Sequence, residues 1–172
     1  MKKVLMLFAA VCCMTFMGIT LNSCDHGNDP SKKTDLTKLD PYLVFGANYA
    51  DVQAHMEAKD WYKAGNDSLE YWPNMGWHRW YWVADSLTEQ YIFETQDGQN
   101  LVYVETYCYD SKVPFSEGEK YLTDKGYISM SKVTDYKTGE TSELFMSKDK
   151  LLRARLREYG KYWFIIYFLP PM

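Results

Sequence analysis

The second half of the chain alternates apolar and polar residues with a period of two, which predicts a succession of β-strands. The expected strands cover residues 77–83, 90–95, 100–109, 127–136, 143–147 and 162–169. The last of them is almost wholly apolar, as in a strand covered on both faces, and Pro170 and Pro171 end it.

Residues 151–159 fit two patterns. Leu152, Ala154 and Leu156 alternate with three arginines, which favours a strand. Leu152, Leu156 and Tyr159 also fit one face of a helix, and the segment contains good helix formers. The sequence leaves both interpretations open.

The dipeptide Asp97-Gly98 separates two of the predicted strands and is preferred in two-residue type I′ turns. It predicts a β-hairpin whose register pairs Phe93 with Val102 and Tyr91 with Val104. The face that carries these four residues is the less charged one, so we expect it to meet the core.

Two helices are expected. Asn48 suits an N-cap and Asp51 can return the bond, which predicts a helix over residues 49–59. Ser116 and Glu119 have the same spacing and predict the start of a second helix.

The element order is therefore helix, strands, a second helix ending before Gly126, and strands again. Local hairpins imply an antiparallel α+β domain. We expect a sheet of about six or seven strands in two loosely repeated helix-then-meander halves, with the helices on one face.

The N-terminus carries a different pattern. Lys2 and Lys3 precede an uncharged, apolar run over residues 4–21, as in a secretory signal peptide. A retained transmembrane helix is the alternative, because the run is close to the ~18 residues that such a helix needs. The acidic and polar residues that follow lack a stop-transfer pattern and favour cleavage.

Leu21-Asn22-Ser23-Cys24 resembles a bacterial lipobox. The resemblance implies cleavage after Ser23, lipidation of Cys24 and attachment to a membrane through several acyl chains such as palmitate. Asp25 and Asp29 resemble, loosely, the surface-export signal of Bacteroidota lipoproteins. We therefore expect an outer-membrane lipoprotein, with the cell surface favoured over the periplasmic face.

These signals divide the chain into a signal peptide (1–23), a flexible tether (24–39) and a single domain (40–172). The mature chain keeps 17 basic and 23 acidic residues, without a basic run among aromatics, so we expect no nucleic-acid partner. Cys108 would be the one free thiol, unable to form an internal disulfide, and its register favours a small buried hydrophobe.

The helix-then-meander order is similar to that of small envelope lipoproteins and of the β-lactamase-inhibitory-protein-like superfamily. Phe45-Gly46 followed by Asp51-Val52 is the local match. The resemblance implies a protein-binding or scaffolding role, and it brings no catalytic residues.

Candidate chemistry is sparse. His26, His55 and His78 do not have metal-ligand spacing, no GxSxG elbow is present, and the acidic residues are scattered. We expect no metal, no cofactor and no enzymatic activity, and an uncharacterised hydrolase remains the least favoured alternative.

The tryptophan-rich stretch is the strongest candidate for ligand contact. In a strand over 77–83, His78, Trp80 and Trp82 share one face while Trp77, Arg79 and Tyr81 share the other. The candidate contact residues are Trp72, Trp77, Trp80, Tyr81 and Trp82. Two hypotheses follow: a non-catalytic module that binds a protein, and a glycan-binding surface lipoprotein that stacks these rings on sugars. A purely structural role in the core is the third interpretation of the same residues.

Overall fold

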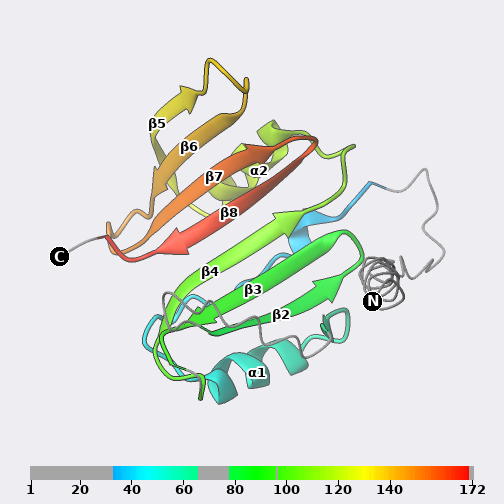
Figure 1. The fold of residues 1–172 in the computed structure, drawn as a ribbon, viewed down its shortest axis with the longest axis vertical. Helices are drawn as coiled ribbons and strands as arrows, with labels where there is room; N and C mark the ends of the chain where they lie inside the picture. The colour runs from blue at the N-terminus through cyan, green and yellow to red at the C-terminus, as the bar shows by residue number, and fades with distance from the viewer. Residues whose placement is uncertain (1–32, 66–77, 96, 171–172) are drawn as a thin grey trace, which may run out of the picture. The chain divides into compact units, whose positions relative to one another are not determined.

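The computed structural model describes residues 33–65, 78–95 and 97–170, and these form one antiparallel sheet with two α-helices (Figure 1). The strand order in the sheet is β1-β2-β3-β4-β8-β7-β6-β5. The strands are β1 (Lys63–Ala64), β2 (His78–Ala84), β3 (Leu87–Phe93), β4 (Leu101–Cys108), β5 (Ile128–Thr134), β6 (Thr141–Met146), β7 (Arg153–Tyr159) and β8 (Tyr162–Phe168). The helices are α1 (Tyr49–Glu57) and α2 (Phe115–Asp124), preceded by the short 3₁₀ helix η1 (Leu36–Lys38).

The α+β class with a largely antiparallel sheet is confirmed, but the expected count of six or seven strands is wrong. The described residues contain eight. The additional strand is β1, whose two residues are too few to show any periodicity. Each half is a helix followed by a meander, and the halves meet where β4 pairs with β8.

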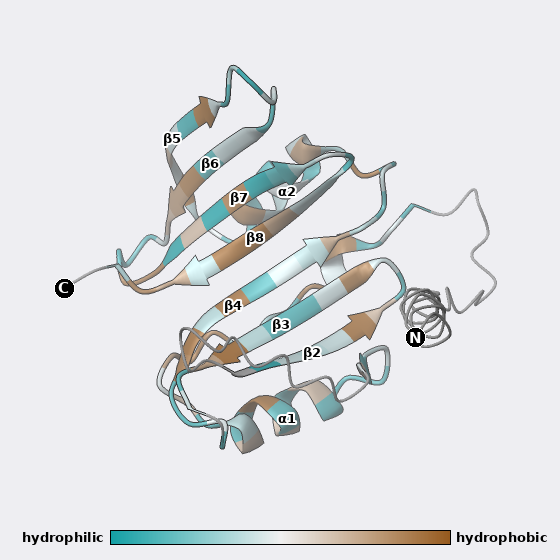
Figure 2. Ribbon diagram, in the orientation of Figure 1, coloured by the Kyte–Doolittle hydropathy of each residue, from teal (hydrophilic) through white to brown (hydrophobic). Residues whose placement is uncertain are grey.

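Residues 153–159 form a strand, which resolves the ambiguity of this segment. Ala154 and Leu156 are fully buried, whereas Arg155 and Arg157 are exposed. Pairing with β6 and β8 on either side fixes this alternation. Hydrophilic and hydrophobic residues accordingly alternate along β7 in Figure 2.

The predicted two-residue turn at Asp97-Gly98 is wrong. Phe93 pairs with Leu101 instead of Val102, across a bulge, although Tyr91 does pair with Val104. The reason is tertiary. Leu101 exchanges backbone hydrogen bonds with residues 46 and 47, and the Gly98 carbonyl accepts from the Tyr49 amide at 2.7 Å. The wider loop thus anchors the start of α1.

The boundaries of the two helices agree only in part with the sequence prediction. Asn48 caps α1 and forms the expected capping box with Asp51. Ser116 does not cap α2, which begins at Phe115 with Pro114 as N-cap and no side-chain cap. Gly126, with φ of +86°, closes α2 as expected, because it and Tyr127 donate to carbonyls of the last turn.

The domain begins earlier than the predicted boundary at residue 40. Thr34 donates through its backbone and its hydroxyl to Asp110, and Lys33 pairs with Glu117 at 2.8 Å. Leu39 is fully buried in the core. Residues 33–39 are therefore part of the folded domain, held by side chains that lie far away in the sequence.

Both α-helices cover the same face of the sheet. Val52 and Met56 of α1 are buried against the first half, and α2 packs on β7 and β8; in Figure 1 α2 lies behind these strands. On this face a continuous row of buried cross-strand neighbours runs through both halves of the sheet: Tyr91, Val104, Tyr167, Ala154 and Phe145. Cys108 is buried on the same side, as expected.

In the part of the chain that the structure describes, no helix combines the length and apolar character needed to cross a bilayer.

Candidate functional site

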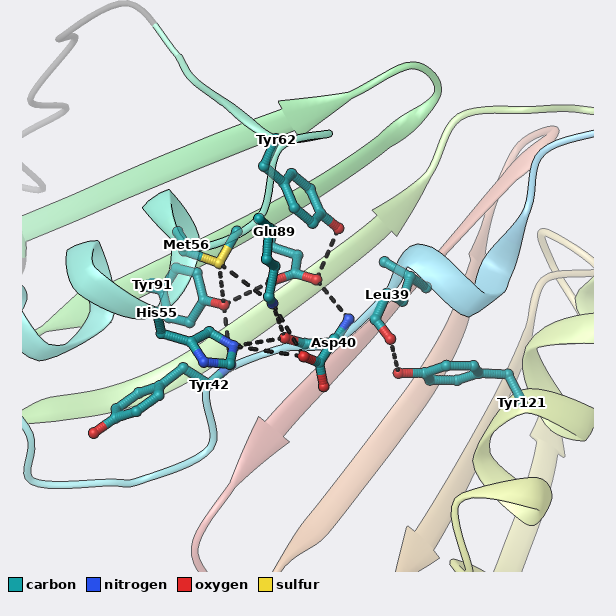
Figure 3. Close-up of polar contacts among 10 residues, drawn as sticks. Leu39, Asp40, Tyr42, His55, Met56, Tyr62, Glu89, Tyr91 and Tyr121 are labelled. Atoms are coloured by element: carbon teal, nitrogen blue, oxygen red, sulfur yellow. Dashed lines mark hydrogen bonds and ion pairs between the residues drawn. The ribbon is translucent and has the colours of Figure 1, made fainter.

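The most extensive buried polar network surrounds Glu89 of β3 (Figure 3). The side chain is fully buried, on the helix-covered face. Its Oε1 accepts from the Tyr62 hydroxyl at 2.8 Å and from the Asp40 amide at 3.0 Å, and its Oε2 accepts from the Tyr91 hydroxyl at 2.7 Å. Three donors thus surround one carboxylate.

The network continues at Asp40. Its carbonyl oxygen accepts from the Lys59 ammonium and lies 2.9 Å from His55 Nε2. The Asp40 carboxylate lies 3.4 Å from Lys59 Nζ, and Lys59 is itself almost wholly buried. Figure 3 shows these groups converging between α1 and the segment that follows η1.

This geometry closes the site to ligands. Burial, helped by the Glu89 carboxylate, raises the pKa of Tyr62 and that of Tyr91 well above the ordinary range, so both hydroxyls stay protonated as donors. Each Glu89 oxygen is engaged by a protein donor and no surface of the side chain is exposed. The arrangement fastens residues 39–42 and α1 to the sheet and presents no free acid or base.

A second acidic pair lies under α2. Glu143 of β6 is buried, and its Oε1 accepts from the Ser129 hydroxyl at 2.5 Å. Lys132 pairs with Glu119 and lies 3.8 Å from Glu143 Oε2. Burial raises the pKa of Glu143, the Ser129 bond opposes this and Glu119 adds to it. Burial also acts to raise the pKa of Glu119, but the hydrogen bonds with Lys132 and Glu143 and the charge of Lys132 outweigh it, and the pKa falls below the usual value.

Opposed pKa shifts in adjacent carboxylates are also found in acid–base pairs of enzymes. Here, however, Lys132 neutralises Glu119, and its Nζ also lies over the Phe115 ring, 5.3 Å from the ring centroid. The pair joins α2 to the β5–β6 hairpin, which is a structural role.

The opposite side of the sheet is different, because neither α1 nor α2 covers it. We call it the helix-free face and define it by the strand residues that point away from the helices. In the central strands these are Arg79, Tyr81, Val83, Thr88, Gln90, Ile92, Tyr103, Glu105, Tyr107, Arg153, Arg155, Arg157, Tyr159, Tyr162, Phe164, Ile166 and Phe168.

Aromatic rings follow one another across the middle of this face. The Tyr107 ring stacks on Tyr109 at 5.6 Å and on Phe164 at 5.2 Å, and Tyr109 meets Tyr162 edge-on at 5.7 Å. Tyr109 is 45% and Tyr162 40% exposed, so part of this aromatic band is open to solvent. Burial and the Glu105 carboxylate raise the pKa of Tyr107, whose hydroxyl donates to Glu105 at 2.6 Å.

Three arginines form a row beside the band. Arg153, Arg155 and Arg157 occupy alternate positions of β7, and Arg157 lies over the Phe164 ring at 5.8 Å. None of the three makes an ion pair with any residue in the described ranges. Their cross-strand neighbours are all uncharged: Ser142, Leu144 and Met146 on β6, and Phe164, Ile166 and Phe168 on β8.

The residues predicted for ligand contact are dispersed. Trp72, Trp77 and the lipidation site Cys24 lie outside the described residues. Trp82 is 3% exposed and belongs to the core, and Trp80 packs on Tyr49 at 4.7 Å, beside that core. Trp82 is buried and Trp80 is partly buried, so the two do not form the expected exposed pair.

Tyr81 alone among the described candidates lies on the helix-free face. Its ring covers Gly65, where an added Cβ would come within 1.8 Å of it. The arginine row was visible in the sequence only as strand patterning. The signal that could have identified it is three cations on one strand face in an acidic chain.

The described part includes surface hollows. One, of about 550 Å³, lies between residues 33–37 and α2 and is lined by both lysines and acidic residues. Another, of about 460 Å³, is lined by Tyr103, Phe168 and the loop before β4. Within the described residues, no three His, Cys, Asp or Glu side chains are placed to hold a metal ion.

Comparison with protein-family models, curated proteins and solved structures gave no match.

Proposed function

We propose that this chain is a membrane-anchored envelope lipoprotein whose domain is a non-catalytic module that binds a partner protein through the helix-free face. The observation that carries the proposal is the combination of exposed aromatic rings and the three β7 arginines, which form no ion pair within the described residues, on one side of a sheet whose other side is closed by helices. Tyr and Arg are the residues enriched at the centres of protein interfaces.

The anchor half of the proposal depends on Leu21-Asn22-Ser23-Cys24. Lipidation at Cys24 would leave only eight residues between the anchor and Lys33, where the folded domain begins. Such a tether reaches roughly 30 Å at most, so the domain would stay near the bilayer. The resemblance of Asp25 and Asp29 to a surface-export signal favours the outer membrane, with the cell surface ahead of the periplasmic face.

A non-catalytic role is supported by the state of the two acidic clusters. Glu89 is saturated by three donors, and Glu119 is neutralised by Lys132. The glycan-binding alternative has less support among the described residues, because Trp82 is a core residue and Trp80 is packed beside the core. Trp72 and Trp77 lie outside the described residues.

The test is site-specific photo-crosslinking in cells. A photoreactive amino acid at Tyr162, on the helix-free face, should give a discrete protein adduct, whereas the same group at Lys125, after α2, should not. Equal adducts at both positions, or none at either, would reject the binding face. Mass spectrometry of the N-terminal peptide, with Cys24→Ser as the control, tests the lipid anchor separately.

A further inference from the structure

The charges of the helix-free face are strongly unbalanced. The full chain has a net charge of −4, yet the described strands place four arginines on this face and one carboxylate, Glu105. Arg79 donates to Gln90 at 3.0 Å. The arginine row on β7 therefore concentrates positive charge on one side of an otherwise acidic protein.

The row is not neutralised from within the described domain. Arg155 pairs across the strands with Leu144 and Ile166, and Glu105 lies on the far side of Ile166. Two strand spacings, or about 9.6 Å, separate the backbones of Glu105 and Arg155, and within the described residues their side chains form no ion pair. The Glu105 carboxylate is also occupied by the Tyr107 hydroxyl.

Like charges at this spacing are costly unless a ligand or solvent ions compensate them. The neighbours are apolar except Ser142 beside Arg157, and they reduce the access of water to the arginine stems, which strengthens the attraction of an anion. The guanidinium fork binds a carboxylate through two parallel hydrogen bonds.

Strand geometry selects the form of the anion. Alternate residues of a strand lie about 6.8 Å apart, and so do alternate side chains of any extended peptide. A peptide with acidic residues at every second position can thus place one carboxylate over each of Arg153, Arg155 and Arg157. Its intervening side chains would point away from the sheet, and where the segment continues past Arg157 it would reach the aromatic band at Tyr162.

From this match we infer that the arginine row is the recognition site for an extended acidic segment of the partner protein, with carboxylates at alternate residues. This inference depends on the proposed function and names the chemistry of the partner. The mechanism is electrostatic selection of one strand-like segment, with Tyr109 and Tyr162 supplying the adjoining apolar contact.

Fluorescence anisotropy with the full chain in detergent provides the test. The probes are labelled peptides of alternating Asp and Tyr, alternating Asn and Tyr, and polygalacturonate as an anionic glycan. The Asp peptide should bind, with an affinity that falls as salt rises. R153Q/R155Q/R157Q should weaken it by about tenfold or more, while the matched control K112Q/K120Q/K125Q, on the side of α2, should not.

A second triple variant guards against misfolding. R153K/R155K/R157K keeps the charge and loses the fork, so binding should fall to an intermediate level. Equal binding of the Asn peptide, equal losses in the arginine and lysine variants, or tighter binding of polygalacturonate would each overturn the inference. If the Tyr162 crosslink persists in R153Q/R155Q/R157Q, the binding face stands and the acidic segment is wrong. If the crosslink is absent from the wild type, the proposed function itself fails.

Discussion

The Tyr107 ring lies nearly parallel to the Phe164 ring, 5.2 Å away, across the β4–β8 pair that joins the two halves of the sheet. On the helix-covered side of the same two strands, Cys108 pairs with Trp163, and both are buried. The junction is thus held from both faces: by core packing on one and by a stacked pair on the other.

This stack should contribute measurable coupling between the halves. In a double-mutant cycle of Tyr107→Leu and Phe164→Leu, we expect an interaction energy of about 0.5–1.5 kcal/mol in urea unfolding. Tyr136 is 89% exposed, so Tyr107→Leu combined with Tyr136→Leu should be additive. A null result for the first pair would mean that the rings are adjacent without stabilising the junction.

Glu89 leads to a second prediction, because three donors depend on it. Glu89→Leu leaves the donors of Asp40, Tyr62 and Tyr91 without their acceptor and should cost about 3 kcal/mol or more. Glu89→Gln keeps one oxygen acceptor and should cost less, because the Tyr91 hydroxyl can also turn to Met56 Sδ at 3.2 Å.

The control for this series is Glu57→Gln at the exposed end of α1, which should change the unfolding free energy by no more than about 0.5 kcal/mol. If Glu89→Leu were equally mild, the buried network would not be what fastens residues 39–42 to the sheet.

Local signals were sufficient for some of these elements. Asn48 and Asp51 form their capping box within one helical turn, and Gly126 closes α2 through its own backbone conformation. Asp97-Gly98 failed as a tight turn because the pairing of Leu101 with residues 46 and 47 is non-local. Sequence periodicity does not report such a contact.

The same contrast between local signals and non-local contacts applies to the arginine row and to Glu89. Alternation showed that Arg155 and its neighbours would share a strand face, but the absence of acids around them depends on β6 and β8 pairing on either side. Glu89 was missed altogether. The signal in the sequence was its position between Leu87 and Tyr91 at alternate residues of one strand, which places the Glu89 carboxylate on the helix-covered face with them.

Acid and neutral pH should affect two carboxylate variants in opposite ways. The pKa of Glu119 is lowered in the fold by Lys132 and Glu143, against burial, so its contribution to stability is present above the unfolded value of 4.5 and disappears as pH falls. Glu119→Gln should therefore destabilise at neutral pH, and the difference should shrink in acid.

For Glu143 the sign is reversed. Burial, opposed by Ser129 and helped by Glu119, raises its pKa, so its favourable contribution is present below 4.5 and is lost as pH rises through the folded value. Glu143→Gln keeps an acceptor for Ser129 and should be at least as stable as wild type at neutral pH, with no advantage in acid. Urea midpoints measured from roughly pH 4 to 8 test both, and parallel curves for the two variants would contradict the assignment.

The final prediction separates backbone strain from packing at two glycines. Gly98 and Gly139 have nearly the same conformation, with φ of +75° and +74°. A Cβ at Gly139 meets nothing within 4 Å, whereas one at Gly98 would lie 2.6 Å from the Tyr49 Cβ.

Gly139→Ala should thus cost only the left-handed backbone penalty, about 1–2 kcal/mol. Gly98→Ala should cost more, because Tyr49 is fixed at the start of α1 by the bond from its own amide to the Gly98 carbonyl. The excess should fall when Tyr49→Ala is added, since this removes the ring that must move with the Cβ while leaving the Cβ in place. Equal costs for the two single variants would show that the loop before β4 yields freely, and that the wide loop does not anchor α1.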